Sequence, residues 1–204
     1  MKRKPFYVVT TILLALSFIL GGCSATTGTS KFYVLNPLSN SGPVMELGKN
    51  LSIGVGPIKF PGYLTQPQIV TRVSANEIQI SEFKRWAVYL PDHFSQILAD
   101  NLSTLLSTER IYVFPWKKSA PIQYQVLIDI SHFEAGVDGE VQLTAKWEIM
   151  GENDKDDTLI KKSNYNEPIE GTDFESVIKA QSRALGNLSR EIAQAIASLS
   201  NSNT

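Results

Sequence analysis

The first 20 residues constrain this chain most, because a basic start is followed there by one long apolar run. Residues 2–4 are Lys-Arg-Lys, and residues 6–20 are apolar except for three hydroxyl side chains. The 15 residues of this run fall short of the roughly 20 that a membrane-spanning helix needs. The pattern is typical of an export signal that is cut away, so that only the remainder of the chain folds.

The end of the signal and the residue after it read Leu20-Gly21-Gly22-Cys23, which resembles the lipobox of bacterial lipoproteins. The resemblance implies cleavage between Gly22 and Cys23, a diacylglyceryl group on the Cys23 thiol and an acyl chain on its amine. Several acyl chains anchor a protein stably where one is marginal. Cys23 is the only cysteine, so no disulfide within the chain is possible. Apart from this covalent lipid we expect no cofactor.

The residue after the cysteine and the charge of the mature chain narrow the location and the partners. Ser24 stands where lipoproteins retained in the inner membrane usually carry Asp, which by that family rule favours the periplasmic face of the outer membrane. Loss of the three basic signal residues from 19 leaves 16 basic against 20 acidic residues, a net charge of about -4. A weakly acidic protein is a poor match for nucleic acid, which is bound through basic side chains.

Composition and length predict one folded unit after the anchor. Residues 1–22 are the expected signal peptide, residues 23–30 a lipidated tether of small polar side chains, and residues 31–204 a single periplasmic domain. The apolar share of 43% is enough for a sizeable core.

Hydrophobic periodicity predicts an α+β (mixed α/β) fold, with one mostly antiparallel or mixed sheet packed by two amphipathic helices. Strands are expected at 31–35, 51–59, 69–73, 78–80, 111–114, 124–133, 141–149 and 159–169, with a turn at 60–64 and a charged hairpin loop at 151–157. One helix should open at Pro91 with Asp92 as its cap and fade near Thr108. The other should begin at a capping box formed by Thr172 and Glu175 and fray from Ser200.

The chain offers little for catalysis or metal binding. His93 and His132 lie on different expected elements, the first exposed and the second at a strand end, and neither has a further ligand at suitable spacing. Gly54 and Gly56 are interpreted as sites of close packing, because a strand follows them rather than the helix of a phosphate loop. No nucleophile elbow is present. We therefore expect neither an enzyme nor a metal site.

One segment has the composition of a binding surface. Arg85, Trp86 and Tyr89 place a cation and two amphipathic aromatics directly before the first helix. Such residues are frequent binding anchors, and they are as often buried at a strand-to-helix corner. The sequence leaves both alternatives open, and we take the three as candidate partner contacts.

Several stretches together resemble the PqiC/YmbA-type lipoproteins, the auxiliary lipoproteins of MCE-type transporters. They are Phe32-Tyr33-Val34-Leu35, Ile53-Gly54-Val55-Gly56-Pro57, Tyr63-Leu64, Pro67 to Arg72, Arg85-Trp86-Ala87, Asn101-Leu102 and Pro115-Trp116. The family often continues Trp-Ala with Glu-Pro-Leu, whereas Val88-Tyr89-Leu90 follows here, so a contact made by that Glu would be absent or altered.

The resemblance implies a non-enzymatic subunit that docks the MCE-domain protein of a PqiB-like transporter at the outer membrane, as a ring-shaped homo-oligomer. Such a system would move lipid between the two membranes, and the subunit would thereby support envelope integrity. Two alternatives remain open: a monomeric periplasmic lipid-binding carrier, and an envelope-structure or assembly lipoprotein without a transport role.

Overall fold

The computed structural model describes residues 28–39, 45, 51–151 and 158–202. The export signal, the cleavage site at Gly22, the acylation site at Cys23 and most of the expected hairpin loop at 151–157 lie outside these residues. The predicted division into signal, tether and domain therefore stays a prediction.

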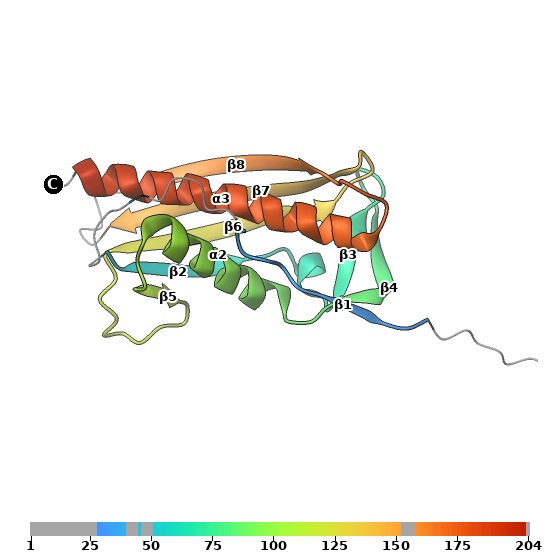
Figure 1. Ribbon diagram of the computed structural model, residues 1–204, viewed down its shortest axis with the longest axis horizontal. Helices are drawn as coiled ribbons and strands as arrows, with labels where there is room; N and C mark the ends of the chain where they lie inside the picture. Colours follow the sequence, from blue (N-terminus) through green and yellow to red (C-terminus); the bar gives the residue numbers. More distant parts are fainter. Residues whose placement is uncertain (1–27, 40–44, 46–50, 152–157, 203–204) are drawn as a thin grey trace, which may run out of the picture.

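Three long strands form one side of the sheet. Strands β6 (Tyr124–Ala135), β7 (Glu140–Gly151) and β8 (Leu159–Pro168) follow one another as an antiparallel meander. The strict apolar alternation from Val141 to Ile149 buries one face of β7 completely, as expected for a half-buried strand. The C-terminal helix packs on this meander (Figure 1).

Both halves of β6 have further strands along their free edge. Strand β2 (Ile53–Lys59) runs parallel to the first half of β6 and carries the short β5 (Ile111–Val113) on its other side. After β2 the chain forms a 3-10 turn, η1 (Gly62–Thr65), and then enters the sheet again as β3 (Gln68–Arg72). Strand β3 lies parallel to β6, at the C-terminal end of β6. There a single ladder pair, Thr71 with Ala135, joins β3 to β6.

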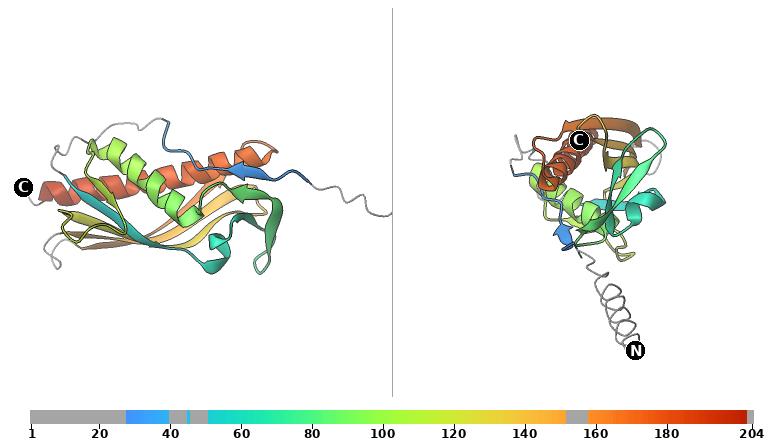
Figure 2. Two further views of the ribbon diagram at one scale, coloured as in Figure 1. Left: turned by 90° about the horizontal axis from the view of Figure 1, so that it is seen from below. Right: turned by 90° about the vertical axis from the view of Figure 1, so that its right-hand side faces the viewer.

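An extension of three strands continues from that end of β6. Strand β4 (Ile78–Trp86) pairs antiparallel with β3, and β1 (Lys31–Tyr33) pairs in parallel with β4 as the outermost strand. We call β3, β4 and β1 the extension. The described chain enters the domain beside it, whereas the C-terminus lies at the opposite end of the elongated molecule (Figures 1 and 2).

Two helices cover one face of the sheet. Helix α2 (Leu90–Leu106) and helix α3 (Phe174–Ser202) lie side by side on that face, which leaves the other face of the meander without a helical cover (Figure 2). Their apolar stripes meet the inward side chains of the strands, and the largest fully buried residues include Trp147, Phe94 and Phe133. The predicted α+β fold with a mixed sheet and two amphipathic helices is confirmed.

The helix caps differ from those expected. Asp92 lies in the first turn of α2 rather than at its cap, which is Tyr89 and forms no side-chain capping bond. In α3 the cap is Asp173 and not Thr172, because the Asp173 carboxylate accepts a hydrogen bond from the Ser176 backbone N–H at 2.9 Å. Adjacent hydroxyl and carboxylate residues both suit a cap, so spacing could not choose between them.

Element lengths also differ in places. Strand β4 extends to Trp86, six residues past the predicted 78–80, because pairing with β1 and β3 supports a stretch whose own alternation is weak. Helix α3 continues to Ser202, past the expected fraying point at Ser200. The expected turn at 60–64 is the 3-10 turn η1.

Gly54 and Gly56 lie where β2 meets other parts of the chain closely. A Cβ on Gly54 would stand 2.9 Å from a methyl of Ile122, and one on Gly56 would stand 2.9 Å from Cβ of Phe114. Gly56 also has a φ of +112°, a conformation nearly restricted to glycine. The predicted role of these glycines in close packing is confirmed.

Gly56→Ala should lower the free energy of unfolding by about 2 kcal/mol or more, since it adds both backbone strain and an overpacked contact. Urea unfolding followed by circular dichroism measures this change. Gly62→Ala is the matched control, because nothing lies within 4 Å of the added Cβ there. Equal stability of the two variants would contradict this account of Gly56.

Candidate functional site

The predicted contact residues lie at the end of β4, and the structure separates them. Trp86 is 6% exposed and packs in the core, so the buried alternative holds for its side chain. Tyr89 is 51% exposed and Arg85 is half-buried. The Arg85 Nε atom is buried and has no hydrogen-bond partner in the described part of the chain. Contact of Arg85 and Tyr89 with a partner stays a prediction.

The outward face of the β1–β4 ribbon carries apolar side chains that sequence reasoning missed. Phe32 and Val34 of the β1 segment are 63% and 44% exposed, and Phe83 of β4 is 37% exposed. The intervening Tyr33 points inward, with its ring 5.5 Å from that of Phe174. All four side chains from Phe32 to Leu35 are apolar, so the sequence does not show which alternate pair faces the core until the neighbouring strands are known.

A groove of about 740 Å³ lies along the same ribbon, next to the start of α3, and Phe32 and Phe83 are among the residues that line it. Lys31 and Lys84 are direct partners in the β1–β4 ladder and both line it. The Lys84 ammonium stands 4.2 Å from the centre of the Phe174 ring, a cation–π contact. The tether-side end of the domain therefore combines basic groups with exposed aromatic surface.

A buried carboxylate ties the extension to the meander. Glu134 of β6 is 1% exposed and accepts hydrogen bonds from Arg72 of β3, at 2.9 Å from Nε and 2.8 Å from Nη2. The hydroxyl of Tyr63, from η1, lies 3.2 Å from both carboxylate oxygens, and His132 Nδ1 lies 3.0 Å from one of them. We call Glu134, Arg72, Tyr63 and His132 the carboxylate cluster.

The electrostatics of the carboxylate cluster favour a fixed structural contact. Burial, followed by the negative charge of Glu134, raises the pKa of the Tyr63 hydroxyl to about 12. Tyr63 therefore remains a hydrogen-bond donor to the carboxylate at physiological pH. A buried charge held by several donors costs much to uncover, so this cluster holds η1, β3 and β6 in one arrangement.

A second polar network joins β8 to α3. The Glu191 carboxylate accepts hydrogen bonds from Ser163 at 2.5 Å and from the Tyr165 hydroxyl, and pairs with the Lys161 ammonium at 2.6 Å. Ser163 in turn accepts a bond from the indole N–H of the buried Trp147 at 2.9 Å. Partial burial alone would raise the pKa of Glu191, but these three partners outweigh it and lower that pKa.

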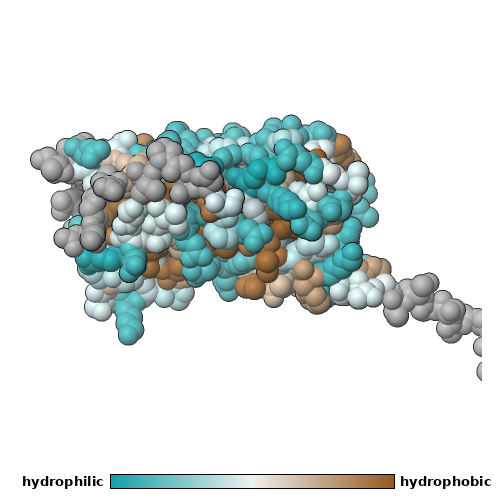
Figure 3. Space-filling model, viewed as in Figure 1, coloured by the Kyte–Doolittle hydropathy of each residue, from teal (hydrophilic) through white to brown (hydrophobic). Residues whose placement is uncertain are grey.

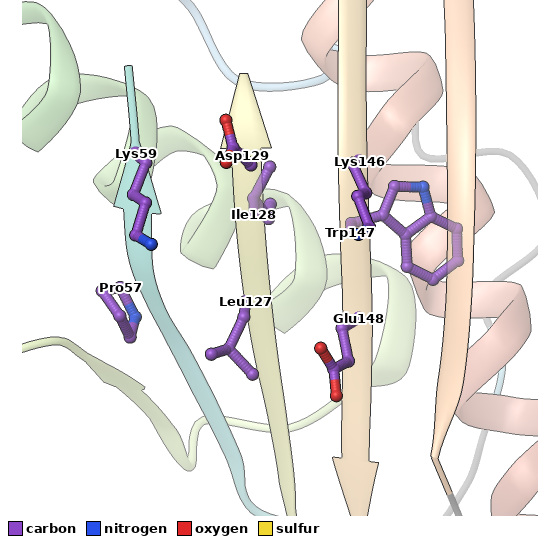
Figure 4. A pocket seen from close by; sticks show the side chains of 8 residues that line it. All are labelled: Pro57, Lys59, Leu127, Ile128, Asp129, Lys146, Trp147 and Glu148. Atoms are coloured by element: carbon purple, nitrogen blue, oxygen red, sulfur yellow. The ribbon is translucent and has the colours of Figure 1, made fainter. Parts of the chain in front are cut away.

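The face of the sheet without helices carries a shallow hollow of about 290 Å³ between β2, β6 and β7. Lys59, Asp129 and Lys146 form one row across it in ladder register, and Leu127 and Glu148 lie in the row beside them (Figure 4). Opposite charges alternate along the first row, as on a solvated sheet face. Nothing in this hollow resembles a catalytic arrangement.

The two histidines are bound into the fold. His93 is half-buried, where sequence had suggested exposure, because its Nδ1 accepts a hydrogen bond from the Leu35 backbone N–H at 3.4 Å. Burial lowers the pKa of His93. Among the described residues, no three His, Cys, Asp or Glu side chains come together in a way that could hold a metal ion. No helix in the described ranges is both long and apolar enough to cross a bilayer.

Comparison with known proteins gives a family match over most of the chain. The model of the family described as "ABC-type transport auxiliary lipoprotein component" matches residues 33–193. A search of curated proteins found no match.

Two solved structures are similar in fold. The crystal structure of an uncharacterized protein matches with a TM-score of 0.68 at 19% identity, covering 83% of this chain and 99% of the other. A Xanthomonas campestris protein of the DUF330 family matches with a TM-score of 0.67 at 16% identity, covering 85% and 100%. At these identities the likeness is one of fold alone.

Arg72→Met should lower the free energy of unfolding by about 3–5 kcal/mol, because it leaves the Glu134 charge buried without its main partner. Urea unfolding measures the loss. Lys179→Met removes an exposed ion pair with Glu175 and should cost under about 1 kcal/mol. The double variant Arg72→Met/Glu134→Leu should recover much of the loss. A cost for Arg72→Met no larger than for Lys179→Met would contradict the role of the cluster.

Glu191→Gln should reduce the loss of folding stability that occurs as the pH falls into the acid range. Because the folded-state pKa of Glu191 is lowered from 4.5, its contribution is present above that value and is lost as the pH falls through the folded-state pKa. Thermal unfolding between neutral pH and pH values below 4.5 measures the slope. The exposed Glu109→Gln is the control, and a Glu191→Gln profile parallel to it would refute this assignment.

Proposed function

Because the chain belongs to the family of ABC-type transport auxiliary lipoprotein components, we propose that it is the outer-membrane subunit of an MCE-type intermembrane lipid transport system. In this role it docks the periplasm-spanning MCE protein and supports envelope integrity without catalysing a reaction. Lipids on Cys23 hold it at the periplasmic face of the outer membrane. Ser24 supports the outer over the inner membrane.

The filled interior of the domain is the observation that carries a docking role over a carrier role. Phe94, Phe133 and Trp147 occupy the space between the helices and the sheet with 0–1% exposure. The two hollows of about 290 and 740 Å³ described above open on the surface and are partly lined by charged side chains. A monomeric carrier needs an apolar cavity that encloses most of its ligand, so lipid would pass alongside this chain or between several copies.

The elongated shape supports the same role. The chain enters beside the extension, and the meander carries the opposite end away from the anchor (Figure 1). The exposed Tyr89 and the half-buried Arg85 are the proposed partner contacts, and Trp86 fixes their backbone from the core. Strands β1, β5 and β8 are sheet edges in the described part of the chain. Such edges suit pairing between copies in a ring-shaped homo-oligomer.

The proposal predicts that cross-linking in cells, followed by purification of the acylated natural chain, recovers an MCE-domain protein. Cys23→Ala, which cannot be acylated or processed, should leave the outer-membrane fraction and lose that partner. Labelled palmitate should enter the natural chain only. Repeated absence of an MCE protein from a natural chain that does reach the outer membrane would refute the docking role.

A further inference from the structure

We propose that the outward face of the β1–β4 ribbon is a second membrane contact, in which Phe32, Val34 and Phe83 enter the interfacial region of the bilayer beside the lipid anchor. The inference rests on the proposed acylation of Cys23. It adds to the anchor a fixed orientation of the domain on the membrane.

The ribbon presents a continuous apolar face at the end where the chain enters. Phe32 and Val34 point to the same side because side chains alternate along an extended chain. Arg85 of β4 is the ladder partner of Phe32, so Arg85 and Phe83, two residues before it, lie on this side as well. The space-filling view shows hydrophobic side chains along this edge, close to where the described chain begins (Figure 3). Exposed apolar groups in a cluster mark an interaction surface rather than ordinary exposure.

The length of the tether decides what this face meets. Gly28 lies against the Phe83 ring, such that a Cβ on it would stand 3.0 Å from the ring. Four residues lie between Cys23 and Gly28, and the five extended steps from one to the other span at most about 18 Å. With acyl chains on Cys23, the apolar face therefore lies within that distance of the bilayer surface, whichever way the tether runs.

The charges around this face match a lipid headgroup layer. Arg85 is the ladder partner of Phe32 and shares its side of the ribbon, and the buried Nε of Arg85 has no partner among the described residues. Lys31 and Lys84 belong to the other side of the ladder, and they reach the margin of this face through the groove that they line together with Phe32 and Phe83. Lysine and arginine stems lie along apolar surface while their heads reach phosphates.

Two of the three carboxylates near these cations already have other partners in the described part of the chain. Asp173 caps α3 through Ser176, and Glu175 is paired with Lys179 at 2.8 Å. Glu82, which is exposed on β4, is the remaining carboxylate on the ribbon. Aromatic and basic side chains side by side are typical of protein surfaces at the membrane interface.

Fluorescence quenching tests the contact directly. The acylated chain carrying Phe32→Trp is reconstituted in vesicles of phosphatidylethanolamine and phosphatidylglycerol with brominated acyl chains, and the emission of the natural tryptophans is subtracted. The matched control is Ile160→Trp, at an apolar position 58% exposed on β8. Its ladder neighbours lie where β6 begins, away from the extension. Bromolipid should quench Phe32→Trp at least twofold more than Ile160→Trp.

The outcomes separate this inference from the proposed function. Equal quenching at both positions, or none at either, in protein that stays on the vesicles overturns the membrane contact while leaving the anchor intact. Protein that fails to remain on the vesicles refutes the anchor itself. Val34→Trp serves as a second reporter if circular dichroism shows that Phe32→Trp disturbs the fold. The vesicles contain no MCE protein, so docking does not influence the result.

Discussion

The Glu134 carboxylate lies where η1, β3 and β6 meet, and the position of the whole extension depends on it. Strand β3 shares only one ladder pair with β6, so backbone hydrogen bonds alone hold the junction weakly. Arg72 closes it with two charge-assisted bonds to a buried acceptor, an arrangement that tolerates little displacement. Within the described sheet, β1 pairs with β4 and β4 pairs with β3, while Tyr33 and Leu35 add contacts to the helices. The contacts of Glu134 therefore help to set the direction in which the end of the domain that carries β1 faces.

The helical layer and the sheet layer have different parts in the proposed function. Helix α3 covers one face of the meander and α2 covers β2 and β5 beside it, and polar networks such as that of Glu191 join β8 to α3. The opposite side and the sheet edges remain available to other chains. A close-packed interior resists deformation, which suits the proposed role of holding a partner at a fixed position relative to the membrane. The interior between the helices and the sheet is filled by side chains such as Phe94 and Trp147, and this is why assembly between chains matters for the proposed role.

Much of the fold could be predicted because each element carries its own period. The alternation from Val141 to Ile149 and the three- and four-residue spacing from Phe94 to Leu106 are local signals, and both elements formed as expected. The remainder depended on neighbours. Strand β4 has a weak pattern of its own and extends to Trp86 because β1 and β3 pair with it. The candidate site was only partly predictable, because Trp86 and Tyr89 have similar composition signals and opposite burial.

The sequence by itself determined the α+β class and was the whole basis for predicting an export signal and a lipobox at Cys23, because each is read from consecutive residues or a short period. Enzymes that process the signal act on an extended segment, so local order is sufficient for them. Only the tertiary structure decided that Arg72 meets Glu134, 62 residues away, and that β1 lies parallel to β4 beside the tether. Non-local contacts of this kind arise from the way whole layers pack, and neither partner carries a local signal for the other.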